Sequence, residues 1–358
     1  MERLGLVGLP NSGKSSLFNA LTGGAATVAA HPFSTTETST GVAKVVDQRL
    51  DALAAMSRSR KIVHAGVELA DVAGLVPGAS TGEGLGNRFL GGIREVDALC
   101  LVLRAFEDPE VPGEADPLES LAVLELELVM ADLASLETQL ERRRKAARSD
   151  PALVRAVGAW EEAIAVLQAG TPLYRSGLAA EVLEAVRPAF LLTSKPALLV
   201  VNLGEDQLAS AEKLAAEVLE AAGGGTILVA LCVQLEAEAA QLAPEERGEL
   251  LEGLGLGDGA LAVVCRSAYY LLGRQTFFTT GDKESRAWTF RSGARAPECA
   301  GVIHSDLQRG FIRAEVIGWE ELLGLGSWPA ARASGRLRVE GKDYQVADGD
   351  VLEIRFNV

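Results

Sequence analysis

The stretch G-L-P-N-S-G-K-S, residues 8–15, follows the apolar run Leu4–Val7 and opens a helical pattern over Ser16–Leu21. It matches the phosphate-binding loop G-x-x-x-x-G-K-S. Its glycines let backbone N–H groups approach a β-phosphate, Lys14 supplies a point charge for the β- and γ-oxygens, and the Ser15 hydroxyl can ligate magnesium. The stretch predicts a P-loop α/β domain that binds a nucleoside triphosphate.

The composition of the 358-residue chain, with 48% apolar and 23% charged residues, is typical of soluble globular domains. No uncharged run approaches the roughly 18–20 residues of a membrane helix, and no signal peptide precedes the loop, so we expect a cytoplasmic protein without a membrane partner. The formal charge of −15 opposes nonspecific binding to nucleic acid. We therefore expect no DNA partner, and any RNA contact requires a local basic patch.

The four cysteines stand singly, without C-x-x-C spacing, and this favours buried reduced thiols over a zinc site or disulfides.

A second phosphate-facing segment is H-P-F-S-T-T, residues 31–36, which precedes the alternating pattern Gly41–Val46 of a strand. It offers Thr35 as a second magnesium hydroxyl, although a solvent-facing threonine in a polar loop is the alternative. The segment therefore extends the candidate metal site beyond the P-loop.

A third segment is the short strand Val67–Asp71, which ends in D-V-A-G, residues 71–74. In a D-x-x-G arrangement the aspartate holds magnesium through a water, and the glycine amide faces the γ-phosphate. We predict Ser15, Thr35 and Asp71 at the metal, and Lys14, Thr35 and Gly74 in catalysis. The glycine-rich residues 78–87 that follow have the composition of a switch segment.

The position after the D-x-x-G glycine is Leu75, which cannot orient the attacking water as a glutamine would. Asn11 offers one way to compensate, because its amide oxygen could ligate a monovalent cation where other proteins place an arginine finger. This hypothesis adds K⁺ to the expected Mg²⁺.

The strand pattern Ala197–Val201 delivers Asn202-Leu203-Gly204-Glu205 to the edge where open α/β sheets bind ligands. GTP-selective proteins carry N-K-x-D there, with an aspartate that pairs with guanine. Leu203 and Glu205 replace the lysine and the aspartate, and the longer acid is displaced from the guanine edge. ATP is therefore the expected nucleotide, unless the segment is only a turn after a strand.

Two helical patterns occupy the middle of the chain: Leu126, Val129, Leu133, Leu136 and Leu140, and then Leu153, Val157, Trp160, Ile164 and Leu167. Ser149-Asp150-Pro151 separates them, which predicts an antiparallel hairpin. Residues 142–145 (Arg-Arg-Arg-Lys), the helical tip, could contact ribosomal RNA or be a solvated helix end.

From about Gln275 the pattern changes to short alternating segments, which predict a small mixed β domain. The segments are Arg286–Phe290, Leu337–Val339, Tyr344–Val346 and Val351–Phe356. Several arginines with aromatic neighbours, Arg286 and Trp288 among them, give this part local basicity.

The motifs G-L-P-N-x-G-K-S, H-P-F-S-T, D-V-A-G-L-V-P-G-A-S-T-G-E-G-L-G-N and N-x-x-E, with the block R-A-W to G-V-I-H-S-D, resemble the YchF/Obg-like ATPase family over nearly the whole chain. The resemblance implies a P-loop NTPase that prefers ATP to GTP, hydrolyses it slowly and associates with ribosomes. It also implies that Asn11, Ser12, Gly13, Lys14, Ser15 and Ser16 bind the phosphates, and that Asn202, Leu203 and Glu205 surround the base.

Glu110 departs from this pattern, because bacterial relatives often carry a histidine there. This puts the hydrolysis rate in doubt. Two alternatives stay open: a GTP-selective ribosome-assembly GTPase, and a nucleotide-gated adaptor whose hydrolysis is incidental.

We predict an α/β fold in three parts. They are a P-loop NTPase domain (1–114 and 186–273), an inserted α-helical coiled-coil hairpin (115–185), and a C-terminal domain (275–358) for which the resemblance implies a β-grasp fold of the TGS type.

Overall fold

The computed structural model describes residues 2–23, 27–28, 39–72, 85–109, 115–147, 154–254 and 259–357. The chain folds into two compact units, one formed by residues 1–43 and 68–272, the other by residues 44–67 and 273–358. The sequence boundaries differ from this division, because they assign residues 44–67 to the nucleotide-binding domain. The segment instead packs with the C-terminal part of the chain.

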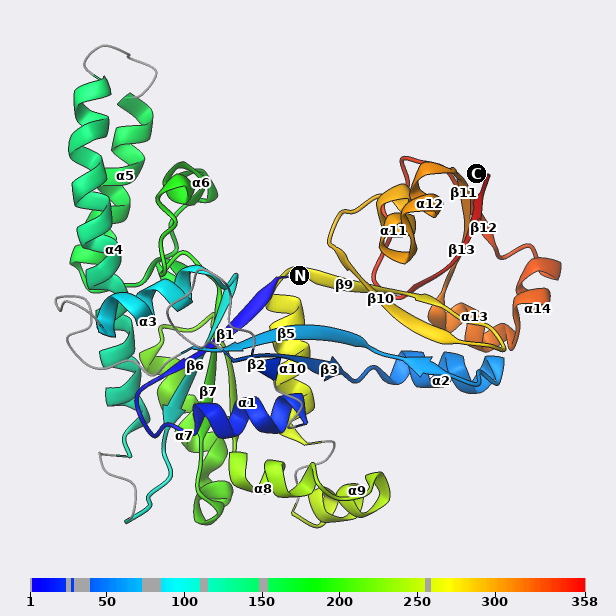
Figure 1. The fold of residues 1–358 in the computed structure, drawn as a ribbon, viewed down its shortest axis with the longest axis horizontal. Coiled ribbons are helices and arrows are strands. Elements are labelled where there is room, and N and C mark those ends of the chain that lie inside the picture. Colours follow the sequence, from blue (N-terminus) through cyan, green and yellow to red (C-terminus); the bar gives the residue numbers. More distant parts are fainter. Residues whose placement is uncertain are drawn as a thin grey trace. The chain divides into compact units, whose positions relative to one another are not determined.

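The first unit is built on a seven-stranded sheet in the order β2-β3-β5-β1-β6-β7-β8 (Figure 1). The central strands pair in parallel, and β2 pairs antiparallel with β3. The strands are β1 (Arg3–Gly8), β2 (Thr27–Val28), β3 (Ser39–Val45), β5 (Ala65–Asp71), β6 (Ala98–Arg104), β7 (Ala197–Asn202) and β8 (Ile227–Leu231). The helices are α1 (Lys14–Thr22), α3 (Leu85–Arg94), α4 (Pro117–Ala147), α5 (Val154–Gln168), α6 (Ala180–Val186), α7 (Ala211–Ala221), α8 (Val233–Ala239), α9 (Pro244–Gly253) and α10 (Ala260–Leu271), with 3-10 turns η2 (Leu173–Arg175), η3 (Arg187–Ala189) and η4 (Glu205–Ser210).

The central strands are buried on both faces. Every residue of β6 and of β7 is buried, as expected for parallel strands covered by helices on both sides. Their apolar side chains join those of α3, α4 and α7 in one core. Because β1, β6, β7 and β8 are parallel, their carboxyl ends meet at one edge of the sheet, where ligands of open α/β sheets bind.

Helices α4 and α5 form the predicted antiparallel pair, with α6 beside them (Figure 1). Trp160 is fully buried in their shared core, and its Nε1–H donates a hydrogen bond to Ala185 O at 2.9 Å. The Arg143 guanidinium lies over the Trp160 ring, 3.9 Å from the ring centre. One member of the predicted seam is wrong, because Leu126 is 57% exposed. This part of α4 packs on the sheet through Leu124 and Leu128, and the contact with α5 begins only further along the helix.

A buried carboxylate ties α4 to the segment that leads into β7. Asp132, 2% exposed, accepts hydrogen bonds from Leu192 N at 2.8 Å and from Thr193 N and Oγ1 at 2.7 Å. Burial raises the pKa of Asp132, although these donors act in the opposite direction. The helical pair is thereby fixed to the strand that ends at Asn202. The boundaries of the insertion, 115–185, stay a prediction.

The second unit is a six-stranded mixed sheet in the order β12-β11-β13-β9-β10-β4. Its strands are β4 (Ile62–Val63), β9 (Arg274–Thr279), β10 (Ser285–Arg291), β11 (Phe311–Gly318), β12 (Arg338–Glu340) and β13 (Asp350–Phe356). Its helices are α2 (Gln48–Ser57), α11 (Ala296–Ile303), α12 (Ser305–Arg309), α13 (Trp319–Leu325) and α14 (Trp328–Ala333). The strand expected at Tyr344–Val346 is reduced to one isolated antiparallel bridge outside the sheet, between Gln345 and Arg295. In this bridge Ala296 N donates to Tyr344 O at 2.9 Å, and Val346 N donates to Ala294 O at 3.0 Å.

Arg49 explains why residues 44–67 fold with the second unit. Its guanidinium pairs with Asp47 at 2.8 Å and with Asp348 at 2.6 Å, and lies 5.2 Å from the centre of the Phe278 ring. Burial acts to lower the pKa of Arg49, but the two carboxylates outweigh it and raise the pKa. Asp348 also accepts from Thr276 N at 2.8 Å. One cation thus joins the start of α2 to the turn before β13 and to β9.

We predict that Arg49→Ala lowers the free energy of unfolding of the second unit by about 2–4 kcal/mol, because it leaves two partly buried carboxylates without their cation. Hydrogen exchange of the α2 and β9 amides measures this change. The control is Arg295→Ala, which removes an exposed ion pair to Asp343 and should cost at most about 0.5 kcal/mol. Unchanged exchange in α2 would contradict the role of Arg49.

Candidate functional site

The P-loop lies between β1 and α1, and its backbone needs two left-handed residues. Asn11 has φ 63° and Gly13 has φ 84° at the N-cap of α1. Asparagine tolerates this conformation better than most side chains. A Cβ at Gly13 would lie 2.2 Å from Asn202 Nδ2, so only glycine fits there. The α1 N-terminus then begins at Lys14, with its amides free of side-chain caps.

Asn202, 4% exposed, connects three segments of the site. Its Nδ2 donates to Ser12 O of the P-loop at 3.1 Å, and its Oδ1 accepts from Val233 N at the start of α8, also at 3.1 Å. Because a buried amide must satisfy both its donor and its acceptor, this pairing fixes the P-loop relative to the start of α8.

The proposed metal ligands Ser15 and Asp71 lie together with Lys14. Ser15 Oγ donates to Asp71 Oδ2 at 2.7 Å, and Lys14 Nζ lies 3.3 Å from Asp71 Oδ1. Asp71 Oδ1 is buried but accepts no hydrogen bond. A hydroxyl and a carboxylate with one oxygen that accepts no hydrogen bond are the hard oxygen ligands that Mg²⁺ prefers, so the donor set fits this ion.

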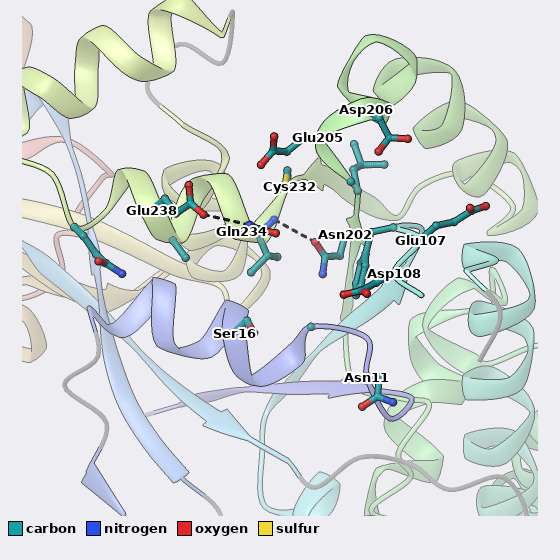
Figure 2. A pocket seen from close by; sticks show the side chains of 17 residues that line it. Asn11, Ser16, Glu107, Asp108, Asn202, Glu205, Asp206, Cys232, Gln234 and Glu238 are labelled. Atoms are coloured by element: carbon teal, nitrogen blue, oxygen red, sulfur yellow. Dashed lines mark hydrogen bonds between the residues drawn. The ribbon is translucent and has the colours of Figure 1, made fainter. Parts of the chain in front are cut away.

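A cavity of about 660 Å³ opens between the P-loop and the carboxyl ends of the strands (Figure 2). Its lining combines the loop with the segments after β6, β7 and β8. It consists of Asn11, Gly13, Ser16, Phe106, Glu107, Asp108, Asn202, Leu203, Gly204, Glu205, Asp206, Cys232, Val233, Gln234, Ala237, Glu238 and Gln241. The volume suits a ligand of nucleotide size.

The lining is acidic. Figure 2 shows Glu107 and Asp108, Glu205 and Asp206, and Glu238 of α8 around the same space. The lining residues include neither lysine nor arginine. An anionic ligand in this cavity therefore needs countercharge from the P-loop end, where Lys14 lies, and from bound cations.

The structure brings together most of the site residues expected from the sequence. Asn11, Gly13 and Ser16 face the same cavity as Asn202, Leu203 and Glu205. Ser12 is an exception, because the residue is only 2% exposed and its Oγ lies against Gly8, so its side chain is not available to a phosphate. Thr35, Gly74, Leu75 and Glu110 lie outside the described residues.

Sequence reasoning missed the segments after β6 and β8. Phe106, Glu107 and Asp108 follow β6, and Cys232, Val233 and Gln234 follow β8. Both strands are apolar runs parallel to β7, and their ends necessarily lie beside Asn202. That topology was the signal for these residues, because neighbouring strand ends of a parallel sheet form one ligand-binding edge.

The cysteines agree with the expectation of buried thiols. All four are free and buried, and burial raises the pKa of each, to about 12 for Cys265. The described part of the chain holds no group of three or more His, Cys, Asp or Glu side chains suited to a metal ion.

Among the residues that the structure describes, no helix combines the length and the apolar character needed to span a membrane.

Comparison with known proteins places the chain among close relatives. A model for 50S ribosome-binding GTPases (MMR_HSR1) matches residues 3–131, and the YchF-GTPase_C model, described as a protein of unknown function (DUF933), matches residues 274–357. The chain is 43% identical to the ribosome-binding ATPase YchF of Bacillus subtilis over 361 residues, and 43% identical to that of Haemophilus influenzae over 360 residues. Each match covers 99% of both proteins.

The structure also matches that of the YchF GTPase of Schizosaccharomyces pombe, with a TM-score of 0.86 and 30% identity, over 99% of this chain and 97% of that one. These matches confirm the expected α/β fold class and the resemblance drawn from the motifs. The chain belongs to the YchF family.

Proposed function

We propose that this protein is a magnesium-dependent ATPase that associates with ribosomes and changes state with the nucleotide it holds. The observation that carries the proposal is the shared cavity, in which the P-loop and the Leu203–Glu205 segment face one ligand-sized space and are tied together by Asn202. The names of the Bacillus and Haemophilus relatives support both the activity and the ribosome. Association with ribosomes would support the expected cytoplasmic location.

In this proposal each polar residue has one task. Lys14 and the P-loop amides would stabilise charge on the transferring phosphoryl group, and the Gly74 amide would face the γ-phosphate. Ser15 and Thr35 would hold Mg²⁺ directly, and Asp71 through a water. The bound ion would supply positive charge at the β- and γ-oxygens.

The choice of ATP over GTP depends on the base side. Leu203 lines the cavity although it is 2% exposed, and Glu205 lines it with an exposed side chain. A guanine site relies on a bidentate match to a shorter acid, and its loss costs several powers of ten in selectivity. The names of the relatives differ on this point. The Bacillus and Haemophilus proteins are called ATPases, whereas the Schizosaccharomyces protein is called a GTPase.

We predict at least tenfold tighter binding of a non-hydrolysable ATP analogue than of the GTP analogue, measured by calorimetry with magnesium. The double change Leu203→Lys and Glu205→Asp should remove this preference, because it restores the acid length and the cationic stem that guanine needs. Asp206→Glu, which alters a neighbouring acid of the same cavity, is the matched control and should leave the preference intact. A wild-type preference for GTP would make the protein a ribosome-assembly GTPase instead.

We predict that Asp71→Asn lowers ATP hydrolysis at least tenfold at limiting magnesium and that raising the magnesium concentration restores part of the rate. The amide keeps an oxygen for Ser15 Oγ but removes the charge that attracts the ion. Magnesium titration of the hydrolysis rate measures the effect. Asp97→Asn serves as the control, because Asp97 lies away from the P-loop. Its carboxylate accepts a hydrogen bond from the backbone N–H of Arg3 at the amino end of β1. If the wild type, Asp71→Asn and Asp97→Asn all depended equally on magnesium, the assignment of Asp71 to the metal site would be refuted.

We also propose that Asn11 holds K⁺ beside the phosphates. Its side chain is exposed at the cavity, and the acidic lining gives a cation there a favourable potential. An arginine finger contributes about 10³–10⁵ in rate, so a cation in its place should be visible in kinetics.

Replacement of potassium by sodium should slow hydrolysis by the wild type at least tenfold, if the cation performs the task of an arginine finger. Asn11→Gly, which keeps the left-handed backbone unstrained but removes the oxygen, should be slow in both salts. Asn11→Asp retains an oxygen and should keep the potassium response. Equal wild-type rates in the two salts would exclude the cation.

The alternative of a nucleotide-gated adaptor depends on Leu75 and Glu110, which lie outside the described residues. No described feature of the site favours it over an ATPase.

A further inference from the structure

A second cavity, of about 310 Å³, lies between α4 and α5. We call it the hairpin pocket, and it shares no lining residue with the nucleotide-sized cavity. Three of its six lining side chains carry N–H donors, and none of the six is a carboxylate. The lining consists of Gln139, Arg142, Arg143 and Ala146 of α4, and Ala156 and Val157 of α5. The hairpin pocket is therefore suited to an anion.

Arg143 presents its donors to the hairpin pocket in a fixed orientation. Its guanidinium lies over the ring of Trp160, 3.9 Å from the ring centre, and Trp160 is itself fully buried and bonded to Ala185 O. Stacking occupies the face of a guanidinium and leaves the N–H groups at its edge available for an oxyanion. A ligand would therefore meet a group whose position is already set, which lowers the entropy cost of binding.

The two arginines of the hairpin pocket lack a countercharge. Neither Arg142 nor Arg143 makes an ion pair with a residue that the structure describes. Their neighbour Arg144, which does not line the pocket, pairs with Glu161 at 2.7 Å and with Glu141 at 3.4 Å. Intramolecular pairing thus accounts for Arg144 alone. On a chain with a net charge of −15, two uncompensated cations in one pocket form a local site that attracts anions.

The remaining walls of the hairpin pocket are small or already oriented. Gln139 donates its Nε2 to Ser135 Oγ at 3.2 Å, which fixes the amide. Ala146, Ala156 and Val157 are short and apolar, so they leave space beside the guanidinium groups and do not compete for them. A volume of about 310 Å³ is at the lower end of the range for ligand pockets. It suits an oxyanion with a small organic substituent.

We propose that the hairpin pocket binds a phosphomonoester, which is a phosphate group joined to one organic substituent. A phosphomonoester carries about −1.5 to −2 charges at pH 7 and therefore balances two guanidinium groups. A carboxylate or a phosphodiester carries one negative charge and would leave one arginine uncompensated. Clustered arginines that bind phosphate through paired N–H groups are typical of phosphate recognition. This site does not depend on the proposed ATPase activity.

The test is calorimetric titration of the full-length protein with phenyl phosphate. The P-loop is first saturated with a non-hydrolysable ATP analogue and magnesium, so that the probe does not bind there. Benzoate and methyl phenyl phosphate are the matched probes, because they keep the ring but carry a carboxylate or a phosphodiester. We expect phenyl phosphate to bind at least tenfold more tightly than either. Its affinity should rise as the pH increases through about 6, where the phosphate loses its second proton.

Two variants locate the binding site. Arg142→Gln leaves the stack of Arg143 on Trp160 intact and should weaken binding of phenyl phosphate roughly tenfold, because a charge-assisted hydrogen bond is lost. The matched control is Lys145→Gln, which removes the same charge from an exposed position of the helical tip that does not line the pocket. This control should bind phenyl phosphate as the wild type does.

Equal weakening by Arg142→Gln and Lys145→Gln would mean that only net charge acts, and would overturn the proposal. Equal affinity for the three probes, or no saturable binding of phenyl phosphate, would overturn it as well.

Two further probes identify the source of the phosphate group. Glycerol 3-phosphate represents a phosphorylated metabolite, and a hexapeptide with one phosphoserine represents a modified partner protein. The probe that displaces phenyl phosphate at the lower concentration from the wild type, and loses affinity in Arg142→Gln, names the source and supports the proposal. Failure of both probes to displace phenyl phosphate would refute it.

Discussion

The candidate site depends on the two hydrogen bonds of the Asn202 side chain. A buried amide that lost either partner would cost about 1–3 kcal/mol, so the P-loop carbonyl and the α8 amide are held at one separation. Gly13 must lack a side chain for this contact to form. The spacing between the P-loop and the start of α8 is therefore set before any ligand arrives.

The helical pair contributes to the same geometry from a distance. Asp132 on α4 takes three hydrogen bonds from the residues that precede β7, and β7 ends at Asn202. Tyr174 and Arg175 add a second anchor through Glu125, which accepts from both at 2.5–2.9 Å. The two helices thus stabilise the strand that leads to the cavity residues Asn202–Asp206.

Much of the fold could be read from local pattern. The P-loop, the apolar strands and the second helix with Trp160 follow rules that involve neighbouring residues only. The misplacement of Leu126 arose because α4 changes partner along its length, from the sheet to α5, and periodicity does not identify partners. Tyr344–Val346 alternates like a strand, but it pairs only through one isolated bridge with Arg295 and joins no strand of the sheet.

The least predictable feature was the attachment of residues 44–67 to the C-terminal sheet. Arg49 and Asp348 are nearly 300 positions apart (|i−j| = 299), and no local signal in the sequence links them. The same limit hid Phe106 and Val233, whose place in the cavity follows from strand order rather than from any motif around them. The cavity residues that follow β1 and β7 were predicted, and those that follow β6 and β8 were not.

The discontinuous second unit limits how such a chain can be shortened or recombined. A chain that ended at Leu272 would retain α2 and β4 but lack the sheet that they join, and would expose Leu50 and Leu53, which are fully buried in the intact protein. A single genetic crossover near residue 273 would likewise combine α2 of one parent with the β9–β13 sheet of another. The two halves of this unit must therefore be inherited together, and we expect substitutions at Arg49 and Asp348 to be coupled over evolution.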